Sequence, residues 1–189
     1  MRLILFGGVH GVGKTTLLNH LTGIFGEKLP IFDPGIYFWK HLYELGDKTI
    51  PEVEEIVISE LGKMKDNQMI VCNWHYAVWT KNGYIPQLCY ANLERLIQVT
   101  NPDAVTLILI RASVEEVYKR RMADTEIKKR KIDIKCIEEE ACATESAIEE
   151  HFGVIRKWME PKLIVVENTE LEETRKLLVK IMGAEILNK

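Results

Sequence analysis

The sequence predicts an α/β fold in which a five-stranded parallel sheet lies between two layers of helices. Two observations lead to this prediction. Short apolar runs alternate with helical patterns from one end of the chain to the other, and several of the runs are continuously apolar. A continuous apolar run is typical of a strand that is covered on both faces, and alternating strands and helices favour a parallel sheet.

The expected strands are the apolar runs at residues 3–6, 29–32, 69–72, 105–110 and 163–166. The expected helices carry apolar side chains at helical spacing, at residues 14–25, 36–45, 51–65, 87–99, 114–123, 134–151 and 170–182. Pro51 suits the first turn of its helix, where its missing N–H costs nothing. Asn168 or Thr169 is expected to cap the last helix.

Composition limits the possible classes of protein. The chain has 189 residues, 47% of them hydrophobic, a net charge of −3 and a pI of about 6.0. We expect one globular domain over residues 1–189 and no general binding to nucleic acid. No apolar run reaches the roughly 18 residues of a membrane span, and no signal peptide is expected. The four cysteines lack C-x-x-C spacing, so reduced thiols and a cytoplasmic location are expected.

The octet GVHGVGKT at residues 8–15 matches the pattern G-x-x-x-x-G-K-[ST] between an expected strand and an expected helix. In such a loop glycines let consecutive N–H groups point at phosphate oxygens, and the new helix adds its positive end. Lys14 would supply a cation near the β- and γ-phosphates, and the Thr15 hydroxyl would bind Mg²⁺. The predicted fold is therefore a three-layer P-loop NTPase fold with ATP and Mg²⁺ as cofactors. The candidate ATP-binding residues are Gly8, His10, Gly11, Val12, Gly13, Lys14, Thr15 and Thr16.

Basic side chains gather between residues 111 and 131, after the fourth expected strand. We interpret residues 120–134 as a short helical lid. Arg120 and Arg121 are candidate catalytic residues, because guanidinium groups can neutralise charge on a phosphoryl group in transfer. A solvated helix face is the alternative interpretation for each cation in this segment.

Three further segments follow expected strands and should border the ligand, because ligands of such sheets lie beyond the carboxyl ends of the strands. Segments 33–40 and 73–84 supply candidate acceptor-binding residues, and the backbone of 167–170 is a candidate for contact with adenine. Asp33 would contact the acceptor or magnesium, although a capping role is equally compatible. Lys40 would bind an acceptor phosphate, and His75 and Trp79 would contact the acceptor. Phe38 and Trp39 are expected in the core.

Several stretches resemble the archaeal-type adenylate kinases. Residues 8–16, GVHGVGKTT, are similar to the phosphate loop of that family. Residues 75–86, HYAVWTKNGYIP, resemble its more specific H-x-x-x-x-T-x-x-G-Y-x-P element, and residues 101–125 resemble its fourth strand, following helix and lid entry. The resemblance covers most of the chain. It implies reversible phosphoryl transfer from Mg-ATP to AMP in the cytosol, by a protein that can be a homo-oligomer.

Two residues depart from that family's pattern. Asn73 stands where the family has an acidic residue that helps to hold the magnesium shell. Trp79 stands where the family has an arginine, and without that cation the case for AMP is weaker. A tryptophan at this position could instead stack on a base.

The sequence therefore predicts a kinase that transfers the γ-phosphoryl group of Mg-ATP to a nucleoside monophosphate, with AMP as the first candidate. Three alternatives stay open. The first is an ATPase that acts in assembly, the second is a nucleotide-binding module without efficient chemistry, and the third is a small-molecule kinase with a non-AMP acceptor.

Overall fold

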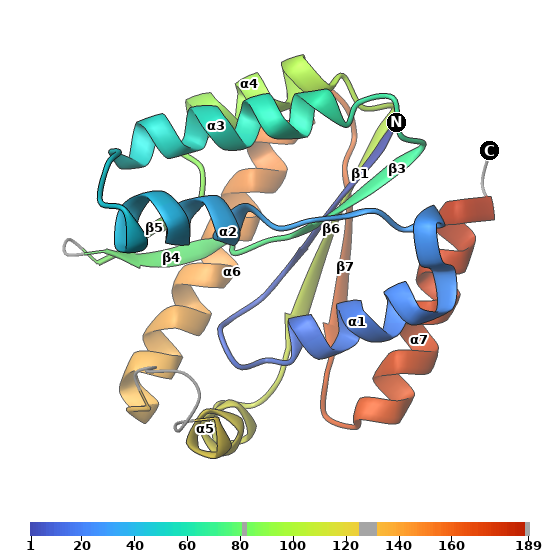
Figure 1. Ribbon diagram of the computed structural model, residues 1–189. Helices are drawn as coiled ribbons and strands as arrows, with labels where there is room; N and C mark the ends of the chain where they lie inside the picture. The colour runs from blue at the N-terminus through green and yellow to red at the C-terminus, as the bar shows by residue number, and fades with distance from the viewer. Residues whose placement is uncertain (81–82, 125–131, 188–189) are drawn as a thin grey trace.

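Five parallel strands form one sheet in the part of the chain that the computed structural model describes, residues 1–80, 83–124 and 132–187. Their spatial order is β2-β3-β1-β6-β7 (Figure 1). The strands are β1 (Arg2–Gly7), β2 (Ile31–Phe32), β3 (Met69–Asn73), β6 (Ala104–Arg111) and β7 (Lys162–Glu167). All five expected strands are present, within two residues of their expected ends.

The helices cover both faces of this sheet. They are α1 (Lys14–Phe25), α2 (Pro34–Phe38), α3 (Ile50–Lys63), α4 (Tyr90–Thr100), α5 (Val114–Ala123), α6 (Ile134–Arg156) and α7 (Leu171–Leu187). A short 3₁₀ turn, η1 (Gly26–Lys28), follows α1, and a π-helical segment, η2 (Trp39–Glu44), continues α2. Figure 1 shows α3 and α4 on one side of the sheet and α1 and α7 on the other.

The central strand β1 shows why the chain folds into three layers. Its side chains alternate between the two faces, as the period of a strand requires. Leu3 and Leu5 pack in a core with apolar residues of α3, α4 and α6, whereas Ile4 and Phe6 pack in a second core with those of α1 and α7. Because both faces are buried, the strand must be continuously apolar, and its sequence, LILF, has this property.

Two local expectations differ from the structure. Segment 73–84 was expected to be a loop, but it contributes to an antiparallel hairpin of β4 (Ala77–Thr80) and β5 (Gly83–Pro86). Asn168 does not cap the last helix, which begins three residues later, at Leu171. Its side-chain amide is buried and donates a hydrogen bond to the carbonyl oxygen of Val12 instead.

The predicted lid, 120–134, lies partly outside the described residues, which omit 125–131. Arg120 belongs to the end of α5, and Ile134 begins α6 with Asp133 as its N-cap. No described helix is both long enough and apolar enough to cross a membrane.

A buried histidine on α6 makes stability depend on pH. His151 is fully buried, accepts a hydrogen bond at Nε2 from Trp74 Nε1 (3.4 Å) and faces the Ala147 carbonyl oxygen through Nδ1 (2.5 Å). Burial disfavours the charged ring and lowers the pKa of His151 to about 4 from a value of 6.5.

Acidification from pH 6.5 to pH 4 is therefore expected to destabilise the protein, because the unfolded chain takes up a proton at His151 and the native state does not. The loss is about 3 kcal/mol by linkage. Denaturant unfolding of the wild type and of His151→Asn across this range would measure it. A wild-type stability that changes with pH no more than that of the variant would contradict the assignment.

Candidate active site

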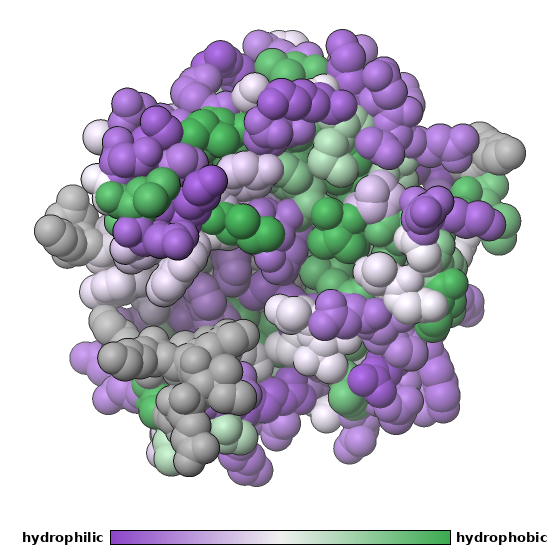
Figure 2. Space-filling model, viewed as in Figure 1, coloured by the Kyte–Doolittle hydropathy of each residue, from purple (hydrophilic) through white to green (hydrophobic). Residues whose placement is uncertain are grey.

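A cleft of about 660 Å³ opens at the carboxyl ends of β1, β2 and β3. We call it the phosphate cleft. In the view of Figure 2 the surface is hollowed below α2. The residues that line it are His10, Gly11, Gly13, Lys14, Thr15, Thr16, Asp33, Gly35, Ile36, Trp39, Lys40, Glu44, Asn73, His75, Arg120 and Asp124.

The glycine loop forms one wall of the cleft and has the conformation that its motif predicts. Gly13 stands directly before α1 with a φ of +100°. A Cβ at this position would lie 2.8 Å from the side-chain nitrogen Nδ2 of Asn168. Only glycine fits this position without strain. The first turn of α1 contains no acidic side chain, so its N-terminal N–H groups and positive dipole end favour an anion.

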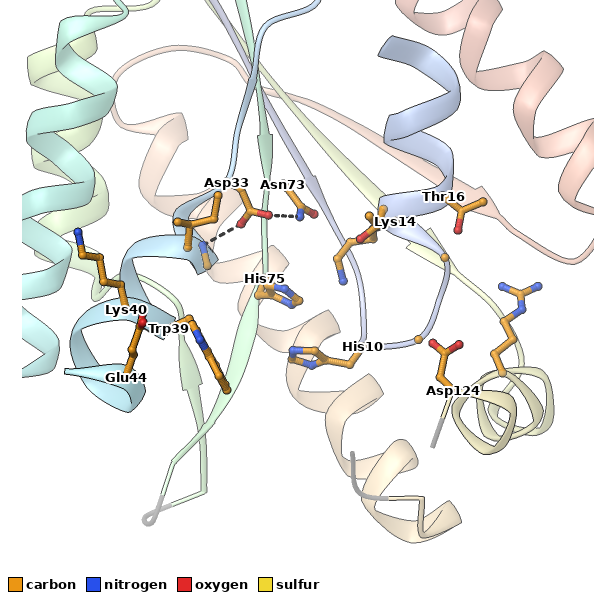
Figure 3. A pocket seen from close by; sticks show the side chains of 16 residues that line it. His10, Lys14, Thr16, Asp33, Trp39, Lys40, Glu44, Asn73, His75 and Asp124 are labelled. Atoms are coloured by element: carbon orange, nitrogen blue, oxygen red, sulfur yellow. Dashed lines mark hydrogen bonds between the residues drawn. The ribbon is translucent and has the colours of Figure 1, made fainter. Parts of the chain in front are cut away.

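Lys14 lies in the centre of the site. Its side chain is buried, and the ammonium group donates to the carbonyl oxygens of Gly8 (2.5 Å) and Val9 (3.1 Å). Both partners are neutral, so a phosphate that enters the cleft can replace them with a stronger charge-assisted contact. Figure 3 shows Lys14 pointing from the start of α1 into the space that Asp33, Asn73 and His75 border.

Arg120 reaches the same cleft from α5. Its guanidinium donates to the carbonyl oxygens of Val12 and Asn168, each at 2.9 Å, and to the Glu116 carboxylate, also at 2.9 Å. These contacts tie the end of α5 to the glycine loop and to the segment after β7. Arg120 thus lines the same cleft as the glycine loop, and its predicted catalytic role stays a prediction.

Arg121 points elsewhere and is buried. Its guanidinium forms an ion pair with Glu140 of α6 (2.7 Å) and donates twice to the carbonyl oxygen of His10 (2.8 and 3.1 Å). Glu140 in turn accepts from the backbone N–H of His10 and contacts its ring nitrogen Nδ1, both at 2.7 Å. Burial by itself would raise the pKa of Glu140, but His10 and the Arg121 guanidinium outweigh it and hold this pKa at about 2.

Removal of the Glu140 carboxylate is expected to destabilise the protein strongly. In Glu140→Ala the buried Arg121 loses the ion pair, and the cost of breaking such a pair is about 3–5 kcal/mol. Glu149→Ala, at an exposed position of the same helix, serves as the matched control and should change stability by less than about 0.5 kcal/mol. Equal urea midpoints for the two variants would show that the pair is not needed for stability.

Asp33 and Asn73 meet across the ends of two neighbouring strands. Asp33 Oδ1 accepts from the backbone N–H of Gly35 (2.9 Å) and thereby caps α2, whereas Oδ2 accepts from the Asn73 side-chain amide (2.8 Å; dashed in Figure 3). Asp33 was expected either to cap a helix or to border the ligand. In the structure the residue caps α2 and also lines the cleft.

A second pocket, of about 450 Å³, adjoins the phosphate cleft. We call it the aromatic pocket. It shares His10, Gly35, Trp39 and His75 with the cleft, and its other lining residues are Phe38, Leu42, Tyr43, Ile50, Val78, Trp79, Thr80, Tyr84, Ile85, Gln87, Arg121 and Glu140. The rings of His10 and His75 stack with centroids 4.2 Å apart and lie at the boundary between the two spaces.

The structure brings most of the sequence candidates together. Lys40 and His75 line the phosphate cleft, as do six of the loop candidates, whereas Trp79 and Arg121 line the aromatic pocket. Gly8 and Val12 do not line the cleft, since the Val12 side chain is in the core. The expectation that Trp39 is a core residue is wrong, because its side chain is 65% exposed.

Sequence reasoning missed Glu44, Gln87, Asp124 and Glu140. Glu140 had a detectable signal, since it lies on the apolar stripe of α6, three residues after Ile137 and four before Thr144. An acidic residue on a buried stripe indicates a paired charge. Gln87 carried no such signal.

The oxygen donors of the cleft fit the cation that the loop motif implies. Thr15 is exposed at the start of α1, and Asp33 presents its carboxylate from the end of β2. Mg²⁺ prefers such oxygen ligands and is commonly bound by one or two protein groups together with phosphates and water. Among the described residues, no group of three or more His, Cys, Asp or Glu side chains is arranged to hold a metal ion.

Comparisons with known proteins place the chain by its fold. No protein-family model matches the sequence. Over 43 residues, 23% of the chain, it is 46% identical to the thymidine kinase of Epstein–Barr virus (strain B95-8), of which the match spans 7%. The structure is similar to the YorR protein of Bacillus subtilis in complex with phosphorylated GDP (TM-score 0.64, 14% identity, 98% of this chain and 97% of that one). The fold is that of the P-loop kinases.

Two proteins that are named as kinases show a similar likeness. They are deoxyadenosine kinase of M. mycoides (TM-score 0.56, 15% identity, 97% of this chain and 100% of that one) and shikimate kinase of Acinetobacter baumannii (TM-score 0.51, 17% identity, 100% and 94%). The three-layer fold with a five-stranded parallel sheet is thus confirmed. The resemblance to adenylate kinases is confirmed only as far as the P-loop kinase fold.

Proposed function

We propose that the chain is an ATP-dependent kinase that transfers the γ-phosphoryl group of ATP to a hydroxyl group of a small molecule. The observation that carries the proposal is the Asp33 carboxylate, which lines the same cleft as Lys14 and the glycine loop. A hydroxyl acceptor must lose a proton during transfer, and a carboxylate can accept it. A phosphate acceptor is already an anion, so the same carboxylate would repel it.

Residues at different positions in the cleft are expected to have different roles. The loop amides, the start of α1 and Lys14 hold the donor phosphates, and Arg120 adds a cation beside them. The Thr15 hydroxyl would hold Mg²⁺, which would supply charge neutralisation at the phosphates when bound. Asn73 and the Gly35 N–H fix the Asp33 carboxylate, so Asn73 is a positioning residue here.

The reaction transfers one phosphoryl group and one proton. The acceptor oxygen attacks the γ-phosphorus, the bond from that phosphorus to the β–γ bridging oxygen breaks, and ADP leaves. The proton of the hydroxyl passes to Asp33. No covalent enzyme intermediate is needed, because positioning and charge stabilisation account for catalysis of this kind.

The similar proteins agree with this proposal. Two of them are named as kinases of small molecules, shikimate and deoxyadenosine, and the partial sequence match is to a thymidine kinase. Transfer to AMP is the second candidate function. It is favoured by the resemblance of residues 75–86 to the adenylate kinase element and by Lys40, a cation in the cleft that suits an acceptor phosphate.

The test is product analysis after the protein is mixed with Mg-ATP and one acceptor at a time. Nucleosides, nucleoside monophosphates, gluconate and shikimate form the panel, with water alone as the control. ADP formed in step with a phosphorylated hydroxyl compound would support the proposal. ADP formed only with AMP would favour the second candidate. Free phosphate at one rate in every tube would overturn both in favour of an ATPase.

A further inference from the structure

The aromatic pocket has the properties of a site for a flat, uncharged ring. Trp39 and Trp79 are 65% and 47% exposed, although burial of such side chains stabilises a protein. Each is held by a neighbouring ring, Trp39 by Tyr43 at 5.5 Å and Trp79 by Tyr84 at 5.1 Å. Aromatic side chains that are fixed yet exposed at a pocket are suited to pack against a planar ligand.

The charged side chains of this pocket neutralise each other, so the pocket does not favour an ionic ligand. Among the described residues, Arg121 and Glu140 are the lining side chains with a permanent charge, and they form an ion pair with each other. The pocket volume, about 450 Å³, lies within the roughly 300–1,000 Å³ of small-molecule sites.

Two polar groups in the pocket have a fixed orientation. Gln87 is buried, and its side-chain oxygen accepts from the backbone N–H of His75 (2.8 Å), so the amide has its NH₂ group to offer as a donor. The Tyr84 hydroxyl donates to the Cys136 carbonyl oxygen (3.3 Å), which leaves its own oxygen as an acceptor. Burial raises the pKa of Tyr84 to about 12, so the group stays protonated. A donor and an acceptor beside aromatic faces match the edge of a heterocycle.

We propose that the aromatic pocket binds the base of a nucleoside and that the acceptor of this kinase is the sugar hydroxyl of that nucleoside. Because the pocket shares Trp39 and His75 with the phosphate cleft, which Asp33 also lines, a sugar joined to the base would extend toward Asp33. The acceptor part of this inference rests on the proposed kinase function, whereas binding of the base does not.

Two variants test the site. Trp39→Ala removes one aromatic wall, and Gln87→Glu keeps the acceptor for His75 but loses the NH₂ donor. Each should weaken binding of the preferred nucleoside about tenfold, the effect of losing one stacked ring or one good hydrogen bond. In Gln87→Glu, whose position does not line the phosphate cleft, the affinity for ATP should stay within about twofold. Trp158→Ala, also exposed but outside both pockets, is the matched control.

The measurements are calorimetric titration of each of the common nucleosides into the protein in the presence of ADP, and steady-state kinetics with the nucleoside that binds best. Nucleoside binding that weakens in Trp39→Ala and in Gln87→Glu, but not in Trp158→Ala, would support the base site. Phosphorylation of that nucleoside would support the acceptor assignment. Nucleoside binding without transfer would keep the base site and overturn the kinase proposal. Transfer to gluconate or shikimate with no nucleoside binding would keep the kinase and overturn the base site.

Discussion

Replacement of Lys14 by methionine is expected to lower phosphoryl transfer by about a hundredfold to a thousandfold, the loss seen when one preorganised group is removed from a developing charge. Methionine keeps the length and most of the packing volume of the side chain, so the change removes the cation and little else. Steady-state kinetics with saturating acceptor would measure the effect. Since the two carbonyl oxygens to which the ammonium group donates, those of Gly8 and Val9, are neutral, the melting temperature should fall by no more than a few degrees.

Lys180→Met is the matched control, because Lys180 is exposed on α7. The control should keep wild-type turnover. A Lys14→Met protein that is folded and turns over at a near-normal rate would refute the role of this loop in transfer.

Asp33→Asn is the second change with a large expected effect. The amide keeps the shape of the side chain and can still accept from the Gly35 N–H, but it cannot take up a proton. If Asp33 is the general base, kcat should fall by about 10²- to 10⁴-fold. The KM for ATP should change little, since the donor phosphates are held by the loop on the other wall. An unchanged kcat would exclude Asp33 as the base.

The companion variant is Asn73→Asp, which exchanges the donor at 2.8 Å for a second carboxylate. Two carboxylates at that distance cannot both stay ionised easily, so the pKa of the pair rises. The acid limb of the pH–rate profile should then move to higher pH. An acid limb that stays in place would show that Asp33 does not set it.

The fold was predictable because its signals are local. Each central strand is buried on both faces, so its sequence is continuously apolar, and the phosphate loop is one contiguous octet. The hairpin of β4 and β5 was missed because segment 73–84 lacks a long apolar run. The strand β4 has only four residues, Ala77–Thr80, and one of them is the polar Thr80. Polar and aromatic composition alone does not separate such a strand from a loop.

The site was only partly predictable because its contacts are long-range. Asp33 meets Asn73 across 40 positions in the sequence, and His10 meets Glu140 across 130. Helical spacing turns Arg120 and Arg121 about 100° apart around α5 but cannot show which of them faces the cleft and which a buried carboxylate. Only the packing of α5 against α6 decides between them.

The contacts of Arg121, Glu140 and His10 also constrain how this chain can change over evolutionary time. Loss of the Arg121 or the Glu140 charge leaves the other charge buried without its partner. Single replacements at these two positions are therefore expected to be removed by selection. Permitted routes change both positions together, either to another oppositely charged pair or to two apolar residues, with His10 adjusting to the new partner. Related sequences, once aligned, should therefore show positions 10, 121 and 140 varying as a set rather than one by one.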